Sequence, residues 1–330
     1  VQVSGVRLQR GGESADVAAR RVVLCAGALH TPALLLRAGI GPPQDLAAKG
    51  IEVRVPLAGV GRNLQDHPAV GLSAYLMPEA RLSPAVHRAA VLAGRYSSGL
   101  ADCPKGDMHV FVISRSAWHA LGVRLGTVSL RVDHVFSRGH VRLASPAWQD
   151  PPEVDFNFFD DERDLHRLAD GLRRAAHWHR PPRVRACARE PFPTSYSGRV
   201  RALAKVSWRN RLVAHGLAML LDSPWRRSFI ERGITQGVTL QRLLDDESAL
   251  HAFVRKSAAG TWHASGTCRM GSPTDPSAVT DPSGRVYGTS GLYVADASLM
   301  PLLPSGNTNL PTLMIAERIA QALSDTGAAP

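Results

Sequence analysis

The chain has 330 residues, of which 44% are hydrophobic and 20% charged, with a net charge of +11. This composition excludes an intrinsically disordered protein and allows one large or two ordinary globular domains. Much of the positive charge lies between Arg163 and Arg232, and a basic surface can bind nucleic acid or anionic lipid. Aromatic residues make up only 6%, and no nucleic-acid recognition motif is present. We therefore expect solvated arginine-rich helices and no nucleic-acid partner.

In chain order, strands are predicted at 1–8 and 18–26, the second continuously apolar as in buried parallel sheets. Thr31-Pro32 then predicts a helix start, with Leu34, Leu35 and Leu36 available to the buried face. A short helix at 43–49 and a strand at 51–55 follow. This alternation of strands and helices favours a doubly wound α/β sheet.

The pattern changes after about residue 68. Alternating residues at 127–135, a turn at 137–139 and a return at 140–143 predict an antiparallel hairpin. A helix is predicted at 160–177, opened by acidic residues, and another begins near 245. We expect 180–193 to be a loop and 203–221 to be helical. The residues expected on the buried faces of the two strongest helices are Leu165, Leu168, Leu172 and Ala175, and then Leu250, Phe253 and Val254.

The last seventy residues return to α/β character. A short buried strand is predicted at 292–296, ending in Asp296. Pro311 predicts a helix start, because its missing N–H costs nothing there, and this helix is expected to reach about Leu323. Its expected buried face consists of Leu313, Ala316, Ile319, Ala320 and Leu323.

The cysteines and the chain start bear on the cellular compartment. The four cysteines form no Cys-x-x-Cys pair, and Cys25, in an apolar run, is expected to be a buried hydrophobe. We favour a reducing, cytoplasmic compartment, and no apolar stretch approaches the 18 residues of a membrane span. Peripheral membrane association stays open. The chain starts with Val1 inside a predicted strand, so we expect a truncated beginning in which a targeting segment would be invisible.

His263 is the first candidate for chemistry. It lies in the run Trp262-His-Ala-Ser-Gly-Thr-Cys-Arg-Met-Gly271, whose small residues permit close backbone approach to a ligand. Imidazole can take a proton near neutral pH, so His263 suits a general base. It could instead be structural. A metal site with Cys268 is not expected, because two ligands cannot close a zinc site.

Asn309 and Asp296 are the next candidates. Asn309 comes just before Pro311, so it is expected outside the helix near its positive end, where it could hold an alcohol oxygen or only satisfy backbone groups. Asp296 ends a buried strand and could bind polyol hydroxyls or cap a turn. Proton removal from an alcohol would need a hydride acceptor, which no side chain provides. No Gly-x-Gly-x-x-Gly occurs, so the usual pyrophosphate cradle is missing.

Together these stretches resemble the glucose–methanol–choline (GMC) oxidoreductase family. Five motifs in family order cover essentially the whole chain: 25–41, Gly59-Val-Gly-Arg-Asn-Leu-Gln-Asp-His67, Asp155-Phe-Asn157, 262–271 and 294–317. The resemblance is strongest to the choline-dehydrogenase-like, alcohol dehydrogenase branch, because Asn309 stands where other branches carry a second histidine. It implies FAD as cofactor, and 1–67 with 259–330 as an incomplete Rossmann-like FAD-binding domain. Residues 68–258 would form a substrate-binding domain with an antiparallel sheet and helices.

The resemblance also implies residue roles. His263 would be the base at the substrate hydroxyl, and Asn309 would bond the alcohol oxygen. Asn63 and Asp66 would pack the loop that covers the cofactor. The residues implied to contact FAD are Gly27, Ala28, Asn63, Trp262, Asp296, Ala297, Thr308, Asn309 and Thr312. The expected reaction is oxidation of an alcohol to an aldehyde or ketone, with hydride passing to flavin N5.

Two matters stay open at this stage. The electron acceptor could be a quinone, another carrier or O2, and the dehydrogenase-like resemblance favours an acceptor other than oxygen. The alternative to an active enzyme is a truncated, flavin-free remnant that acts at most as a binding scaffold. Expected family members have a Gly-rich FAD loop before the first matching motif, and this chain as written lacks it.

Overall fold

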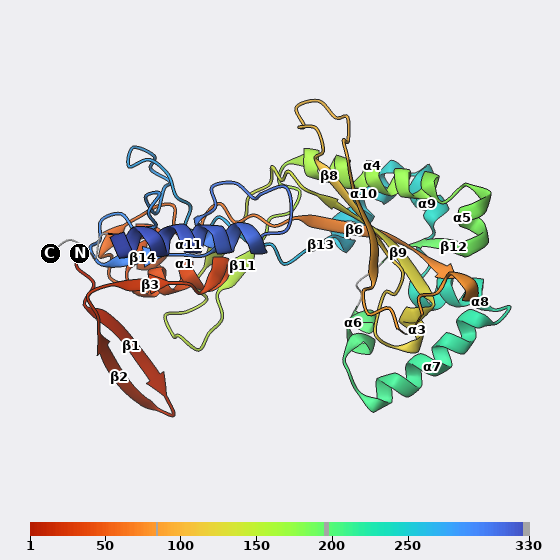
Figure 1. Ribbon diagram of the computed structural model, residues 1–330, viewed down its shortest axis with the longest axis horizontal. Coiled ribbons are helices and arrows are strands. Elements are labelled where there is room, and N and C mark those ends of the chain that lie inside the picture. Colours follow the sequence, from red (N-terminus) through yellow and green to blue (C-terminus); the bar gives the residue numbers. More distant parts are fainter. Residues whose placement is uncertain (84, 195–197, 326–330) are drawn as a thin grey trace. The chain divides into compact units, whose positions relative to one another are not determined.

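The computed structural model describes residues 1–83, 85–194 and 198–325. The chain divides into two compact units, described here separately. The first consists of Val1–His67, Val135–Asp160 and Trp262–Pro330, and the second of Pro68–His134 and Asp161–Thr261. Figure 1 labels the elements of both. These boundaries differ from the expected domain ranges mainly in one respect, because 135–160 belongs with the first unit. The expected α/β class, with antiparallel strands in the middle region, is confirmed.

The first unit is built from short elements. Its helices and strands are β1 (Gly5–Arg10), β2 (Glu13–Ala18), β3 (Val22–Leu24), α1 (Gly27–Arg37), β4 (Ile40–Gly41), α2 (Pro43–Ala47), β5 (Val55–Pro56), β10 (His140–Arg142), β11 (Glu153–Asp155), β14 (Leu292–Val294), the 3-10 turn η3 (Ala297–Leu299) and α11 (Asn309–Asp325). β3 pairs with β14 in parallel, and so does β4 with β5. Its core gathers Leu35 and Leu36 of α1, Val294 of β14 and Ile319 of α11.

Two expectations for the start of the chain are wrong. Residues 5–18 form an antiparallel hairpin whose turn, Gly11-Gly12, has both φ angles positive, the geometry of a two-residue hairpin turn. The hairpin extends from the rest of its unit (Figure 1). The parallel strand that follows is shorter than expected, and Cys25 is exposed rather than buried. Leu34 is also 44% exposed, so only Leu35 and Leu36 of its apolar run are buried.

The second unit centres on an antiparallel sheet in the order β12-β6-β9-β8-β7, with β13 also paired to β6. Its elements are β6 (Pro68–Leu76), the 3-10 turn η1 (Pro78–Ala80), β7 (Ala90–Tyr96), β8 (Met108–Ile113), α3 (Ala120–Val123), β9 (Leu125–Val132), α4 (Glu162–Trp178), α5 (Pro182–Cys187), β12 (Ala188–Pro193), α6 (Gly198–Ala204), α7 (Trp208–Asp222), α8 (Arg226–Phe229), the π-helical turn η2 (Ile230–Ile234), α9 (Leu240–Asp245), α10 (Glu247–Ser257) and β13 (Ala259–Gly260).

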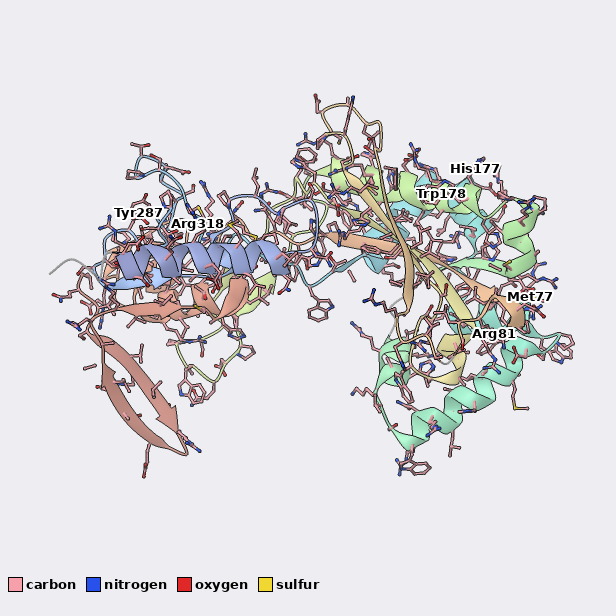
Figure 2. All side chains as sticks on the ribbon, viewed as in Figure 1. Met77, Arg81, His177, Trp178, Tyr287 and Arg318 are labelled. Atoms are coloured by element: carbon pink, nitrogen blue, oxygen red, sulfur yellow. The ribbon has the colours of Figure 1, made fainter. Side chains whose placement is uncertain are left out.

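The two strongest predicted helices of this unit are confirmed. Asp161 caps α4 by accepting the backbone N–H of Arg163, and Asp246 caps α10 by accepting that of Ala249. All of their predicted core residues are buried. α4 packs on β6 and β9 and against α10. Its last turn ends in His177 and Trp178, which Figure 2 labels.

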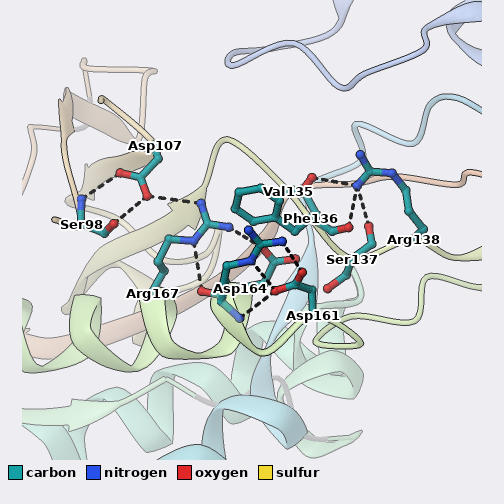
Figure 3. Close-up of polar contacts among 10 residues, drawn as sticks. Ser98, Asp107, Val135, Phe136, Ser137, Arg138, Asp161, Asp164 and Arg167 are labelled. Atoms are coloured by element: carbon teal, nitrogen blue, oxygen red, sulfur yellow. Dashed lines mark hydrogen bonds and ion pairs between the residues drawn. The ribbon is translucent and has the colours of Figure 1, made fainter. Parts of the chain in front are cut away.

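The predicted hairpin of 127–135 and 140–143 is wrong. β9 pairs with β6 and β8, whereas His140–Arg142 pairs with Glu153–Asp155. The segment between them does not turn back, because Arg138 Nη1 donates to the carbonyls of Val135, Phe136 and Ser137 at 2.8, 2.9 and 3.0 Å (Figure 3). Gly139 instead exchanges backbone hydrogen bonds with Leu64. Three carbonyls on one guanidinium hold this loop in its unit.

The expected loop at 180–193 is also wrong. Pro182 starts helix α5, where its fixed φ suits the first helical position. The following strand, β12, lies at the edge of the sheet and has an irregular register between Arg189 and Phe192. Prolines are tolerated in edge strands because their missing N–H faces away from the ladder. Pro191 and Pro193 therefore mark an edge strand here.

Candidate active site

The segment that carries His263 is held on both sides by backbone hydrogen bonds of the first unit. On one side Gln65 and Ser265 exchange backbone bonds of 3.0 and 2.9 Å. On the other, Gly266 donates to the carbonyl of Ala297 at 3.1 Å, and Cys268 to that of Ser298 at 2.8 Å. The segment therefore has a fixed path before any ligand is considered.

Asp66 and His67 fix His263 itself. The Oδ1 atom of Asp66 accepts the backbone N–H of His67 at 2.7 Å and that of His263 at 3.0 Å. The Nδ1 atoms of the two histidines lie 2.8 Å apart, and the rings meet edge to face. Asp66 and His67 are buried, whereas His263 is half-buried. One carboxylate thus sets the backbone of both imidazoles at hydrogen-bond distance.

Asn63 and Gln65 connect the His263 segment to the chain that leads into α11. Asn63 Nδ2 lies 3.2 Å from the carbonyls of both Gly266 and Pro301. Gln65 donates to Pro301 at 3.2 Å and accepts the N–H of Leu303 at 3.1 Å. Asn63 itself has a φ of 60°, a conformation that asparagine tolerates better than most residues. A single short segment, 63–67, therefore positions both stretches that carry the predicted catalytic residues.

Gly266 is required by this packing. A Cβ atom there would lie 2.5 Å from the backbone oxygen of Asn63 and 2.9 Å from Gln65 Nε2, and its φ is +90°. We expect Gly266→Ala to lower the free energy of unfolding by roughly 2–5 kcal/mol, from left-handed strain plus overpacking. Gly50→Ala is the matched control, since its φ is +66° with nothing within 4 Å. Denaturant unfolding that gives equal losses for both variants would contradict this packing.

Asp296 is engaged with the protein. Its carboxylate accepts the backbone N–H of Ser298 at 2.8 Å, that of Gly27 at 2.9 Å and the hydroxyl of Thr31 at 2.6 Å. It thus caps η3 and joins it to the start of α1, which begins at Gly27 rather than at Thr31 as expected. Thr267 adds a bond from its hydroxyl to the carbonyl of Ala28 at 2.6 Å. Contact of Asp296 and Ala297 with a ribityl chain stays a prediction.

The thiol beside this cap is held neutral. Burial and the nearby Asp296 carboxylate raise the pKa of Cys268 far above its usual range. A neutral buried thiol is a poor zinc ligand, because zinc binds the thiolate. Among residues 1–83, 85–194 and 198–325, no group of three or more His, Cys, Asp or Glu is placed to hold a metal ion.

Helix α11 begins at Asn309, so Asn309 is its first residue rather than a residue outside it. Asn309 is exposed, Thr308 before it is buried, and Thr312 donates its hydroxyl to the Thr308 carbonyl at 2.7 Å. The predicted buried face of the helix is partly wrong. Ile319 is buried and Leu323 packs on the core, whereas Leu313 is 54% exposed. Asn309 therefore stands at the positive end of a 17-residue helix.

Trp262 is 95% exposed, with a φ of 65°, directly before the anchored His263. The sequence reasoning singled out His263, Asn309 and Trp262, but it gave no role to Gln65 or His67. Both belong to the run Asn63-Leu-Gln-Asp-His67, whose polar residues 65–67 are all buried. Three consecutive polar residues ahead of an apolar strand could have indicated internal hydrogen-bond partners.

Comparisons with known proteins agree with this geometry. Two family models, both described as GMC oxidoreductase, match residues 1–69 and 135–316. The chain belongs to the GMC oxidoreductase family. The resemblance stated from the sequence motifs is confirmed.

Relatives and solved structures of this family cover nearly the whole chain. It is 40% identical over 324 residues to 5-(hydroxymethyl)furfural oxidase of Methylovorus sp. (strain MP688), covering 97% of this chain and 54% of that protein. An oxygen-dependent choline dehydrogenase of Chromohalobacter salexigens is 31% identical, with 97% and 53% covered. Pyridoxine 4-oxidase from Mesorbium loti superimposes with a TM-score of 0.73 at 25% identity, covering 98% and 55%. The chain spans about half the length of the curated relatives it matches.

No helix within the described residues combines the length and the apolar character needed to cross a membrane.

Proposed function

We propose that this GMC oxidoreductase uses FAD to oxidise the CH–OH group of an alcohol to an aldehyde or ketone, with His263 as the base. The observation that carries the proposal is the anchoring of His263. Its backbone is bound by Asp66 and its Nδ1 by His67, on a segment tied by Asn63 and Gln65 to the approach to Asn309. Such anchoring suits a proton acceptor, whose rate depends on a fixed geometry.

The residues at this site fit a flavin. A long helix starts at the exposed Asn309, and the positive end of a helix favours negative charge on a nearby ligand. Trp262 and Leu310 are 95% and 75% exposed, and apolar surface of this kind packs well against a planar ring. We propose that the first unit belongs to an FAD-binding domain and that the second unit binds substrate. The proposed cofactor contacts are Gly27, Ala28, Asn63, Trp262, Asp296, Ala297, Thr308, Asn309 and Thr312.

Bound FAD would supply the hydride acceptor that no side chain offers. His263 takes the hydroxyl proton at Nε2, because Nδ1 is engaged with His67. Asn309 donates its amide N–H to the alcohol oxygen, which stabilises negative charge as the proton leaves. Asp66 keeps the backbone of His263 in place throughout, since it binds the main chain rather than the imidazole.

For the substrate and the acceptor, the names of the relatives give the direction. Identity to 5-(hydroxymethyl)furfural oxidase exceeds that to the choline dehydrogenases, which supports a primary alcohol on a ring over a quaternary ammonium alcohol. The words oxidase and oxygen-dependent in these names favour O2 as acceptor, in place of the acceptor other than oxygen that the sequence motifs favoured.

The proposal is tested by mixing the flavin-loaded protein anaerobically with 5-(hydroxymethyl)furfural and following flavin absorbance. We expect the absorbance to bleach, and to bleach several-fold more slowly when the reacting carbon carries deuterium, because hydride transfer breaks that bond. Choline serves as the comparison substrate. A flavin that neither of the two alcohols reduces would contradict the proposed function.

A further inference from the structure

The contact between His67 and His263 joins two Nδ1 atoms, and this restricts where the protons lie. A hydrogen bond needs one donor and one acceptor, so at a separation of 2.8 Å one Nδ1 carries a proton and the other offers a lone pair. A neutral histidine carries its proton on one ring nitrogen only. Whichever ring donates through Nδ1 therefore has an unprotonated Nε2.

The two rings cannot easily exchange these roles by moving. Both backbones are bound to the same Asp66 oxygen, at 2.7 and 3.0 Å. His67 is fully buried and immediately precedes β6, whose nine residues are all buried. The rings meet edge to face with centroids 5.1 Å apart and an interplanar angle of 88°, so the edge of one ring points at the other. The separation of the nitrogens is thus imposed by the fold.

We propose that His67 is a positioning residue that accepts the Nδ1 proton of His263 and so keeps Nε2 of His263 ready to take the substrate proton. This inference rests on the proposed function of His263. During the reaction the O–H bond of the alcohol breaks and its proton bonds to His263 Nε2. His263 then carries protons on both nitrogens, and its Nδ1–H still donates to His67. No proton passes to His67, which stays neutral.

The opposite arrangement would disable the base. If His67 donated its Nδ1 proton, His263 would accept at Nδ1 and carry its own proton on Nε2. Its Nε2 would then face the alcohol as a donor and could not remove a proton. The role of His67 is therefore to select one of the two neutral forms of His263, as the orienting carboxylate does in other base-containing sites.

Two variants of His67 separate positioning from mere packing. His67→Asn retains an oxygen on Cγ, where Nδ1 stands in histidine, whereas His67→Leu has similar bulk and no acceptor. We expect His67→Leu to slow flavin reduction roughly 10–100-fold, the usual range for removing a group that orients another ligand or base, with flavin content and substrate affinity unchanged. His67→Asn should recover most of this loss. Equal losses in both variants, or none in His67→Leu, would overturn the inference.

A spectroscopic test needs neither activity nor cofactor. In the full chain labelled with 15N-histidine, long-range 1H–15N correlations show which ring nitrogen of each histidine carries the proton. The signals are assigned with His263→Gln and His67→Gln. We expect His263 to be protonated on Nδ1 and His67 on Nε2, and the reverse pattern would overturn the proposal. If His263→Ala left flavin reduction intact, the proposed function would fail, while the NMR result would still decide how the two rings share their protons.

Discussion

Replacement of His263 by alanine is expected to slow alcohol-dependent flavin reduction by about 10²–10⁴-fold, the usual contribution of general base catalysis. The contacts of the segment make this variant informative. Asp66 binds the backbone N–H of residue 263, and Gln65 pairs with the backbone of Ser265, so alanine leaves both contacts in place. The loss therefore reports on the imidazole rather than on the path of the segment.

Stopped-flow absorbance measures the rate, and the flavin spectrum before mixing measures cofactor content. His30→Ala is the control, because His30 is an exposed histidine on α1 in the same unit. We expect the control to reduce flavin at the unsubstituted rate, and His263→Ala to retain its flavin. Bleaching of His263→Ala at the unsubstituted rate would show that the base lies elsewhere.

The second large effect concerns stability, at Arg167 in the second unit. Its guanidinium lies 3.3 Å from Asp107 Oδ2 and forms an ion pair with Asp164, and all three side chains are fully buried (Figure 3). Ser98 donates its backbone N–H and its hydroxyl to Asp107 at 2.8 and 2.7 Å. Arg167 thus balances two buried carboxylates from α4 and the start of β8.

Replacing Arg167 by methionine keeps much of the bulk of the side chain and removes the charge that balances both carboxylates. Breaking a buried pair from one side typically costs about 3–5 kcal/mol. For a domain of roughly 150–250 residues, each kcal/mol lowers the melting temperature by roughly 2–4 °C. We therefore expect the unfolding transition of this unit to drop by roughly 6–20 °C, measured by calorimetry.

Arg227→Met is the matched control. Arg227 pairs with Glu231 one turn away on the surface, and its side chain is 82% exposed. Exposed pairs contribute about 0–1 kcal/mol, so the transition should move by no more than a few degrees. Equal shifts for the two variants would mean that burial of the Arg167 pair does not matter for stability.

The parts of the fold that the sequence predicted well are those set by local contacts. α4 and α10 were predicted because an aspartate cap and an apolar face both lie within one helix. The hairpin at 127–143 was wrong because strand pairing is non-local. Either partner of β9 could satisfy its alternation of apolar and polar residues, and only the three-dimensional arrangement selects β6 and β8.

The same reason limits the site. His263 and Asn309 were singled out from residue type and setting within their own segments. His67 was not, because its contact with His263 joins residues 196 positions apart. Asp296 shows the reverse, since its role as a turn cap was one of the two readings of the sequence, and the contacts with Gly27, Thr31 and Ser298 support that reading.

The most direct test is a crystal structure of the flavin-loaded protein with an alcohol or alcohol analogue bound. We predict that its hydroxyl oxygen lies within about 2.6–3.2 Å of both His263 Nε2 and an Asn309 amide atom, the reach of a hydrogen bond. An oxygen that contacts neither group, or an imidazole and an amide separated by well over about 10 Å, too far to share one oxygen, would contradict the account.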